Sequence, residues 1–193
     1  MTDIDTVRRV LAAYRPHVVD APHATPTAVA LILVPAARGL DLLFIERAVR
    51  AGDPWSGQIA LPGGRRDPGD ADLAATAIRE TREETGVALA AAERLGTLDD
   101  LHPVTPLLPP VVVRPFVFTL PTRPPITPSA EVREAFWVSF PELRAPGVHR
   151  EVTVNPRGMS LRVPAYVLGD RTIWGMTERI LTPLLRLLDL PTT

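Results

Sequence analysis

The 193-residue sequence contains no cysteine, which excludes disulfide bonds and thiolate metal sites. It also lacks an excess of either charge, because 21 basic and 22 acidic residues give a formal net charge of −1. Proteins that bind nucleic acid usually present a basic surface, so we expect no nucleic-acid partner. The absence of cysteine is compatible with a reducing compartment, and we expect a cytoplasmic protein.

Long apolar runs are absent as well. No stretch reaches the roughly 20 consecutive apolar residues that a membrane-spanning helix needs, so we expect no membrane partner. Residues 1–16 are charged and lack the apolar core of a signal peptide. Hydrophobic residues make up 46% of the chain, which suffices for the core of a soluble protein. We therefore expect one domain over residues 1–193, as a monomer or a homodimer.

The distribution of apolar residues predicts a mixture of helices and strands. Helical spacing predicts a helix over residues 4–14, an amphipathic helix over residues 71–85, and a C-terminal helix over residues 173–188 with a kink at Pro183. Apolar runs predict strands over residues 28–34, 40–47, 57–61, 94–99, 111–120, 135–140 and 161–168. Because strands outnumber helices and their order is mixed, we predict an α+β fold.

Three glutamates lie close together on the predicted helix over residues 71–85. Glu80, Glu83 and Glu84 occupy positions i, i+3 and i+4, which project from one helix face with Cβ atoms about 5–6 Å apart. Like charges at this spacing repel one another, whereas a hard divalent cation such as Mg²⁺ would bind their oxygen atoms. A bare cluster of this kind is more often a solvated charged face. The preceding glycine-rich turn, Pro62-Gly63-Gly64, favours a metal site instead.

The segment over residues 64–87 resembles the Nudix box, G-x5-E-x7-R-E-U-x-E-E-x-G-U, in which U is a bulky apolar residue. Residues 79–87, RETREETGV, match its second half, with Thr81 at the first U position. The first half is one residue longer than the pattern, so its acidic position falls on either Asp70 or Asp72. The resemblance implies an α/β/α sandwich with a mixed β-sheet, and metal-dependent hydrolysis of a diphosphate.

The same resemblance implies a set of metal ligands. By the Nudix pattern, Glu80, Glu83 and Glu84 bind Mg²⁺ or Mn²⁺, and the carbonyl oxygen of Gly63 or Gly64 is a further ligand. The bound cation would neutralise the diphosphate and favour attack by water on phosphorus. The Nudix box therefore predicts both the cofactor and the residues that hold it.

Two further roles in catalysis are expected of neighbouring residues. Arg79 lies four residues before Glu83 and would orient a carboxylate through a bidentate contact. The proton of the attacking water would pass either to Glu83 or to a glutamate of the segment over residues 131–134. Glu131, which precedes a predicted strand, is the candidate in that segment because a loop position suits a general base.

Flanking segments resemble the coenzyme A pyrophosphatase branch of the Nudix family. Residues 56–64, SGQIALPGG, resemble its SGQ-[IV]-[AS]-FPGG stretch, and residues 173–177, IWGMT, resemble its IWGxT motif. Residues 42–47 resemble its LLxTxR strand, and this branch also tolerates the extra residue in the box. Two features depart from its pattern. Leu61 replaces a phenylalanine, and the segment over residues 48–56 is one residue longer.

This second resemblance implies hydrolysis of coenzyme A, or of an acyl-coenzyme A, to 3′,5′-ADP and a 4′-phosphopantetheine species. One alternative is another Nudix hydrolase, acting on a different nucleoside diphosphate derivative or on an oxidised nucleoside triphosphate. A second alternative is a non-catalytic Nudix-fold sensor of nucleotides. The three glutamates argue against the sensor, because a protein that only binds nucleotide does not need them.

A coenzyme A substrate would require a cation for its 3′-phosphate and an apolar groove for its pantetheine arm. The cation would come from Arg47 or Arg50, which lie just before the longer segment. Trp55 and Leu61 would line the groove, and Gln58 belongs to the resembling stretch. These five residues are therefore the predicted contacts of the small-molecule substrate.

Overall fold

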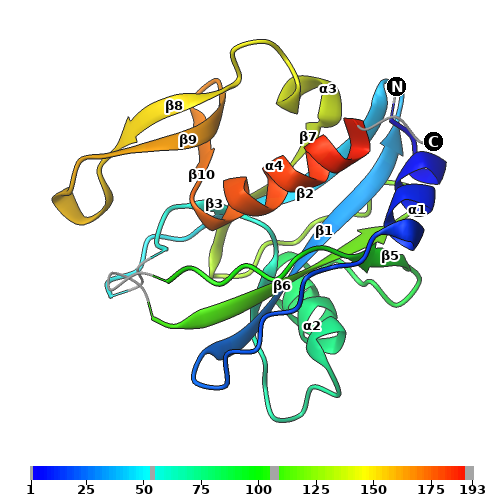
Figure 1. The fold of residues 1–193 in the computed structure, drawn as a ribbon, viewed down its shortest axis with the longest axis horizontal. Coiled ribbons are helices and arrows are strands. Elements are labelled where there is room, and N and C mark those ends of the chain that lie inside the picture. Colours follow the sequence, from blue (N-terminus) through cyan, green and yellow to red (C-terminus); the bar gives the residue numbers. More distant parts are fainter. Residues whose placement is uncertain (1, 53–54, 105–108, 190–193) are drawn as a thin grey trace.

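A mixed sheet forms the centre of the molecule in the computed structural model, which describes residues 2–52, 55–104 and 109–189 (Figure 1). Its seven strands are β1 (Thr25–Ala36), β2 (Gly39–Arg47), β3 (Ile59–Ala60), β4 (Gly63–Arg65), β5 (Glu93–Thr97), β6 (Val111–Thr119) and β7 (Val132–Ser139). The order is β3-β2-β1-β6-β5, with β4 paired to β1 and β7 paired to β2. β1 and β6 are parallel and the other pairs are antiparallel.

Helices cover both faces of this sheet. α2 (Leu73–Thr85) lies on one face, and α1 (Ile4–Ala13) and α4 (Met176–Asp189) lie on the other (Figure 1). Side chains alternate along β1, so Leu31 and Leu33 pack with α1 and α4, while Ile32 packs with α2. The sheet therefore separates two apolar cores. This arrangement confirms the predicted α+β sandwich with a mixed sheet.

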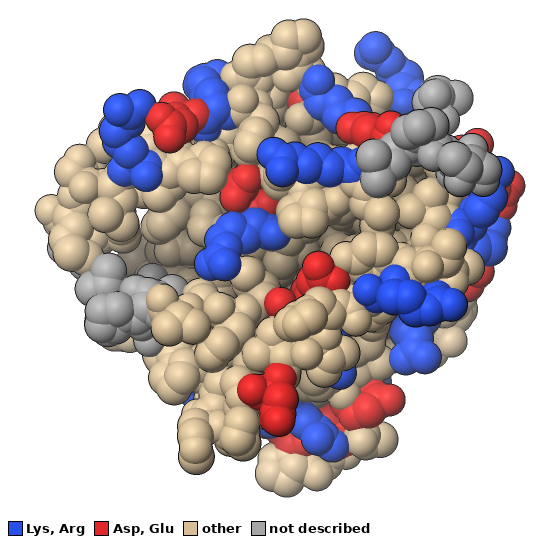
Figure 2. Space-filling view, in the orientation of Figure 1, with Lys and Arg blue, Asp and Glu red and all other residues tan. Residues whose placement is uncertain are grey.

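A second, three-stranded antiparallel sheet lies beside the sandwich. Its strands are β8 (His149–Val154), β9 (Leu161–Leu168) and β10 (Arg171–Trp174), and the β8–β9 pair extends away from the main sheet (Figure 1). The short helices α3 (Phe140–Leu143) and η1 (Pro156–Gly158) connect these elements. No helix in the described part of the chain is long and apolar enough to cross a membrane. On the face that carries α4, acidic and basic side chains are interspersed (Figure 2).

The C-terminal helix predicted over residues 173–188 was wrong at its start. Ile173 and Trp174 belong to β10, and Gly175 has a φ of 68°, which ends the strand before α4 begins at Met176. α4 then continues through Pro183. The sequence also did not predict β8, because most of its side chains are exposed and it lacks an apolar run. β8 is paired along its length with β9, which supplies its hydrogen-bond partners.

The strand predicted over residues 57–61 is shorter, because β3 contains only Ile59 and Ala60. Gly57 has a φ of 71° and the Gln58 N–H donates to the carbonyl of Trp55, so a turn occupies the predicted start. The helix predicted over residues 4–14 ends one residue earlier, at Ala13. The helix predicted over residues 71–85 begins two residues later, at Leu73. The other predicted strands are present, with ends that differ by at most three residues.

Candidate active site

Helix α2 places the three glutamates beside strand β4. Its first turn is capped by Asp72, whose side chain accepts a hydrogen bond from the Ala75 N–H at 2.8 Å. Its last turn is closed by Gly86 in the left-handed conformation, with a φ of 72°. Ala74 and Ala77 are buried against the sheet. Because both ends are defined and one face is buried, the glutamates occupy fixed positions on the C-terminal half of the helix.

Two glycines in β4 allow these carboxylates to approach the backbone. The Gly63 N–H donates to the Glu84 Oε2 at 2.9 Å. A Cβ atom at Gly64 would lie 2.4 Å from the Glu80 carboxylate, and a Cβ atom at Gly63 would lie 2.2 Å from the carbonyl oxygen of Ala28. Gly63 also has a φ of 155°, which disfavours other residues. Gly63 therefore cannot be replaced without moving backbone, and a side chain at Gly64 would displace the Glu80 carboxylate.

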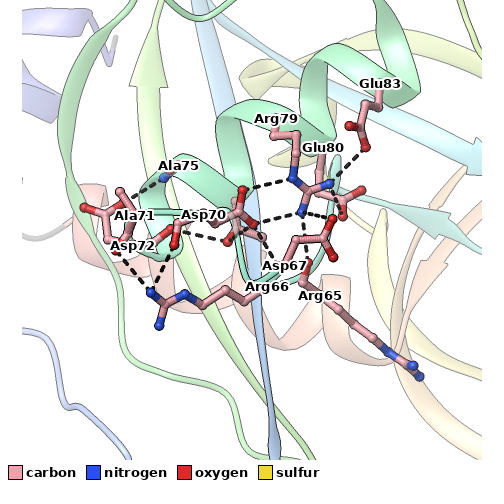
Figure 3. Close-up of polar contacts among 11 residues, drawn as sticks. Arg65, Arg66, Asp67, Asp70, Ala71, Asp72, Ala75, Arg79, Glu80 and Glu83 are labelled. Carbon is pink, nitrogen blue, oxygen red and sulfur yellow. Dashed lines mark hydrogen bonds and ion pairs between the residues drawn. The ribbon is translucent and has the colours of Figure 1, made fainter.

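Arg79 connects the acidic residues at this site (Figure 3). Its Nε and Nη2 atoms donate to the Asp70 carboxylate at 3.0 Å each, and its Nη1 atom donates to Glu80 and Glu83 at 2.9 Å each. Nη2 also donates to the carbonyl oxygen of Arg65 at 3.0 Å. One guanidinium thus contacts three carboxylates and the end of β4, which places Arg79 beside the carboxylates that it is expected to orient.

Asp70, and not Asp72, is the acidic residue that contacts Arg79. The Asp70 carboxylate is buried, and it also accepts hydrogen bonds from the Asp67 N–H and the Thr76 hydroxyl. The Arg79 guanidinium holds the pKa of Asp70 well below its usual range. Asp72 instead caps α2. The extra residue in this segment therefore lets one aspartate start the helix while the other anchors Arg79.

Burial changes the chemistry of two glutamates. Glu84 is only 4% exposed, and burial raises its pKa to about 7, although the Gly63 N–H and Arg47 oppose that shift. The Arg47 Nη1 atom lies 3.8 Å from Glu84 Oε1. Burial also raises the pKa of Glu80. The side chain of Glu83 is 58% exposed, so it faces solvent beside two carboxylates whose charge the protein disfavours.

The raised pKa of Glu84 predicts a pH-dependent stability for the metal-free protein. The folded value of about 7 lies above the ordinary value of 4.5, so this group stabilises the fold most at low pH and loses that contribution as pH rises. Relative to Glu84→Gln, the wild type should lose about 2 kcal/mol of unfolding free energy between about pH 5 and pH 8. Urea unfolding with a chelator present measures this difference. A constant difference between the two proteins would contradict the prediction.

A cavity of about 180 Å³ lies against β4 on the face of the sheet that α4 covers. Four of the predicted substrate contacts and one predicted metal ligand line it, namely Arg47, Trp55, Gln58, Leu61 and Gly64. Its other walls come from β1, β6 and the start of α4, through Thr27, Val29, Val111, Val113, Met176, Thr177 and Ile180. The cavity thus adjoins the carboxylates, with the side-chain-free glycines of β4 between them.

Thr177 explains why the IWGMT segment contributes to this cavity. Its hydroxyl is buried and donates to the carbonyl oxygen of Ile59 at 3.0 Å, which ties the start of α4 to β3. Segments that are more than 100 residues apart in the sequence therefore meet at one wall, since this bond spans 118 residues. The adjacent Met176 supplies an apolar surface to the cavity.

Like the predicted site residues on helix α2, Arg50 and Glu131 do not line the cavity. The Arg50 Nη1 atom lies 2.9 Å from Glu131 Oε1, and both side chains are about half exposed. Glu131 is nevertheless close enough to Glu84 for its charge to help raise the pKa of Glu84. Its loop is held to α2 by the Ser129 N–H, which donates to the carbonyl of Glu84 at 3.0 Å. Glu131 therefore forms an ion pair with Arg50, the arginine that was predicted from the sequence to bind substrate.

Arg65 lines the cavity and was missed by the sequence interpretation. It directly follows Gly63 and Gly64, so its position next to the predicted metal ligands was the available signal. Residues 53 and 54 of the longer segment over residues 48–56 lie outside the described residues.

The carboxylates of Glu80, Glu83 and Glu84 are suitable ligands for a hard divalent cation. They supply oxygen ligands, and Glu80 and Glu84 are like charges that are held close together with limited access to water. In the described part of the chain, no three acidic, histidine or cysteine side chains converge closely enough to hold a metal ion. The reason is that Glu83 turns towards Arg79 and Glu84 turns towards Gly63.

Comparisons with known proteins identify the family and the fold to which this chain is similar. A family model described as the NUDIX domain matches residues 24–157. The uncharacterized Nudix hydrolase NudL of Salmonella paratyphi B is 34% identical over 158 residues, which cover 80% of each chain, and NudL of Salmonella newport gives the same values. The solved structure of a MutT/nudix family protein from Enterococcus faecalis is similar in fold, with a TM-score of 0.58 and 21% identity. That match covers 84% of this chain and 61% of the other.

Proposed function

This chain belongs to the Nudix family, and we propose that within the family it hydrolyses coenzyme A or an acyl-coenzyme A. Nudix hydrolases cleave diphosphate linkages of nucleoside derivatives, and this chain is such a pyrophosphohydrolase. The proposed products are 3′,5′-ADP and the corresponding 4′-phosphopantetheine. The specific substrate is our inference from the cavity and its motifs.

The meeting of two sequence motifs in one cavity is the main support for this substrate. Gln58, Leu61 and Gly64 come from the SGQIALPGG stretch, and Met176 and Thr177 come from IWGMT. Both motifs resemble the coenzyme A pyrophosphatase branch, and they reach the same cavity from distant parts of the chain. The cavity combines apolar walls with arginines, which suits a substrate that has an uncharged arm and several phosphates.

We assign the divalent cation, Mg²⁺ or Mn²⁺, to Glu80, Glu83 and Glu84, with the Gly64 carbonyl as a further ligand. Nudix hydrolases generally use divalent metals, and such a cation neutralises a diphosphate and polarises its P–O bonds. Arg79 holds two of these glutamates in place and is itself anchored by Asp70. The protein thus supplies an oriented set of oxygen ligands.

The exposed carboxylate of Glu83 is our candidate for the group that accepts the proton of the attacking water. The water oxygen forms a bond to one phosphorus, the bond between that phosphorus and the bridging oxygen breaks, and the bridging oxygen leaves with the other phosphate. Glu131 is the alternative acceptor, because it lies near Glu84 and, among the residues that the structure describes, its carboxylate is held by Arg50 alone. No covalent enzyme intermediate is needed.

The substrate is tested by a hydrolysis screen with Mg²⁺ or Mn²⁺ over coenzyme A, acyl-coenzyme A, NADH, ADP-ribose and deoxynucleoside triphosphates. We expect the highest kcat/KM for coenzyme A or an acyl derivative. The reason is that only these substrates combine a diphosphate with a long uncharged arm that can occupy the apolar walls of the cavity.

A deoxynucleoside triphosphate or NADH that exceeds coenzyme A by about tenfold in kcat/KM, a difference of about 1.4 kcal/mol, would refute this substrate. Membership of the Nudix family would be unaffected. Binding without any turnover would instead favour the nucleotide sensor.

A further inference from the structure

Two arginines line the cavity, and they differ in their surroundings. The guanidinium of Arg47 lies 3.8 Å from the carboxylate of Glu84, so part of its charge is used beside the metal ligands. Arg65 is exposed, and among the residues that the structure describes no acidic side chain lies within ion-pair distance of it. An arginine with no acidic partner at the wall of a substrate cavity is available to bind an anion.

The backbone of Arg65 contacts the residues around the carboxylates, whereas its side chain points away from them. The carbonyl oxygen accepts a hydrogen bond from Arg79 at 3.0 Å. The side chain extends away from Glu80, Glu83 and Asp70 (Figure 3). An anion bound to this guanidinium would therefore be a different group from the phosphates held at the glutamates.

The register of the sheet shows what surrounds this side chain. Arg65 lies directly opposite Thr27 in the antiparallel pair of β4 and β1, and Thr27 lies beside Val113 of β6. Residues opposite each other in an antiparallel pair point to the same face, so Arg65 and Thr27 are neighbours at the cavity. The Arg65 side chain therefore has the polar Thr27 next to it and the apolar Val113 beyond Thr27.

We propose that Arg65 binds a phosphate of the substrate other than the two of the cleaved diphosphate. This inference rests on the proposed function, because coenzyme A carries such a phosphate at the 3′ position of its ribose. The sequence assigned this role to Arg47 or Arg50, but Arg50 is paired with Glu131 at 2.9 Å. Arg65 has no such competitor among the described residues and presents a planar fork that matches phosphate oxygens.

The test compares equilibrium binding of 3′,5′-ADP and 5′-AMP by calorimetry in the presence of Mg²⁺. We expect the wild type to bind 3′,5′-ADP about tenfold more tightly than 5′-AMP, as one charge-assisted phosphate contact allows. Arg65→Gln should remove this preference and Arg65→Lys should keep part of it. Arg82→Gln is the matched control, because Arg82 is an exposed arginine of α2 that does not line the cavity. It should leave the preference unchanged.

The inference is wrong if the wild type has no preference for 3′,5′-ADP or if Arg65→Gln retains it. A loss of the same size for both nucleotides would also overturn it, because Arg65 would then contact the shared 5′-phosphate. Hydrolysis of coenzyme A by the wild type is measured separately. Absence of hydrolysis with an intact, Arg65-dependent preference would refute the substrate but not the subsite. Hydrolysis of coenzyme A with a preference that does not depend on Arg65 would refute the subsite but not the substrate.

Discussion

Glu84→Gln is expected to lower turnover by at least about 100-fold while leaving the fold intact, because the loss of one anionic ligand at a catalytic metal removes several kcal/mol of transition-state stabilisation. Glutamine retains an oxygen that can accept the hydrogen bond from the Gly63 N–H. The substitution removes a buried carboxyl group whose pKa burial raises to about 7. Thermal stability without metal should therefore hold or increase at neutral pH.

Steady-state kinetics on the best substrate, together with thermal unfolding in a chelator, measures both effects. Glu93→Gln is a suitable control, because Glu93 pairs with Arg8 away from the cavity. It should change turnover little. Near-normal turnover in Glu84→Gln would refute the role of Glu84 in holding the metal. A large loss of stability would show instead that its charge supports the fold.

Residue spacing alone was sufficient to predict helix α2 and the cluster of glutamates on it. The i, i+3 and i+4 positions of Glu80, Glu83 and Glu84 are local, and helix geometry determines which face they share. The adjacent glycines were likewise visible in the sequence, although only the structure gives the reason, since a Cβ atom at Gly64 would collide with Glu80. Local periodicity and motif were therefore informative about the centre of the site.

The partners of charged residues could not be predicted in the same way. Arg50 and Glu131 are 81 residues apart, and their ion pair depends on how the loop before β7 is held against α2. The choice between Asp70 and Asp72 depended on which of them capped the helix. These outcomes follow from tertiary contacts, which spacing along the chain does not reveal.

The small second sheet illustrates a different limit. The side chains of β8 are mostly exposed, so this strand has no apolar pattern for a sequence interpretation to detect. In β10, Ile173 and Trp174 directly precede the apolar positions of α4, and only the positive φ of Gly175 separates the two elements. A backbone conformation at a single glycine thus decides where the C-terminal helix begins.

Divalent metal should stabilise the folded protein, because a ligand that binds only the native state raises its unfolding free energy by linkage. At about 100 times the dissociation constant the gain is about 2.7 kcal/mol, which for a chain of this size corresponds to a rise in Tm of about 5–10 °C. The gain depends on the anionic oxygens of Glu80, Glu83 and Glu84. Their simultaneous replacement by glutamine keeps the side-chain shapes and removes the charges.

The most direct test of the metal site is therefore thermal unfolding of the wild type and of the Glu80→Gln, Glu83→Gln, Glu84→Gln triple variant, with and without millimolar Mn²⁺ or Mg²⁺. We predict a clear rise in Tm for the wild type and none for the triple variant, which should also lose hydrolysis. The single variant Glu93→Gln should respond to metal as the wild type does. An equal rise in Tm in the triple variant would place the metal elsewhere and contradict the account.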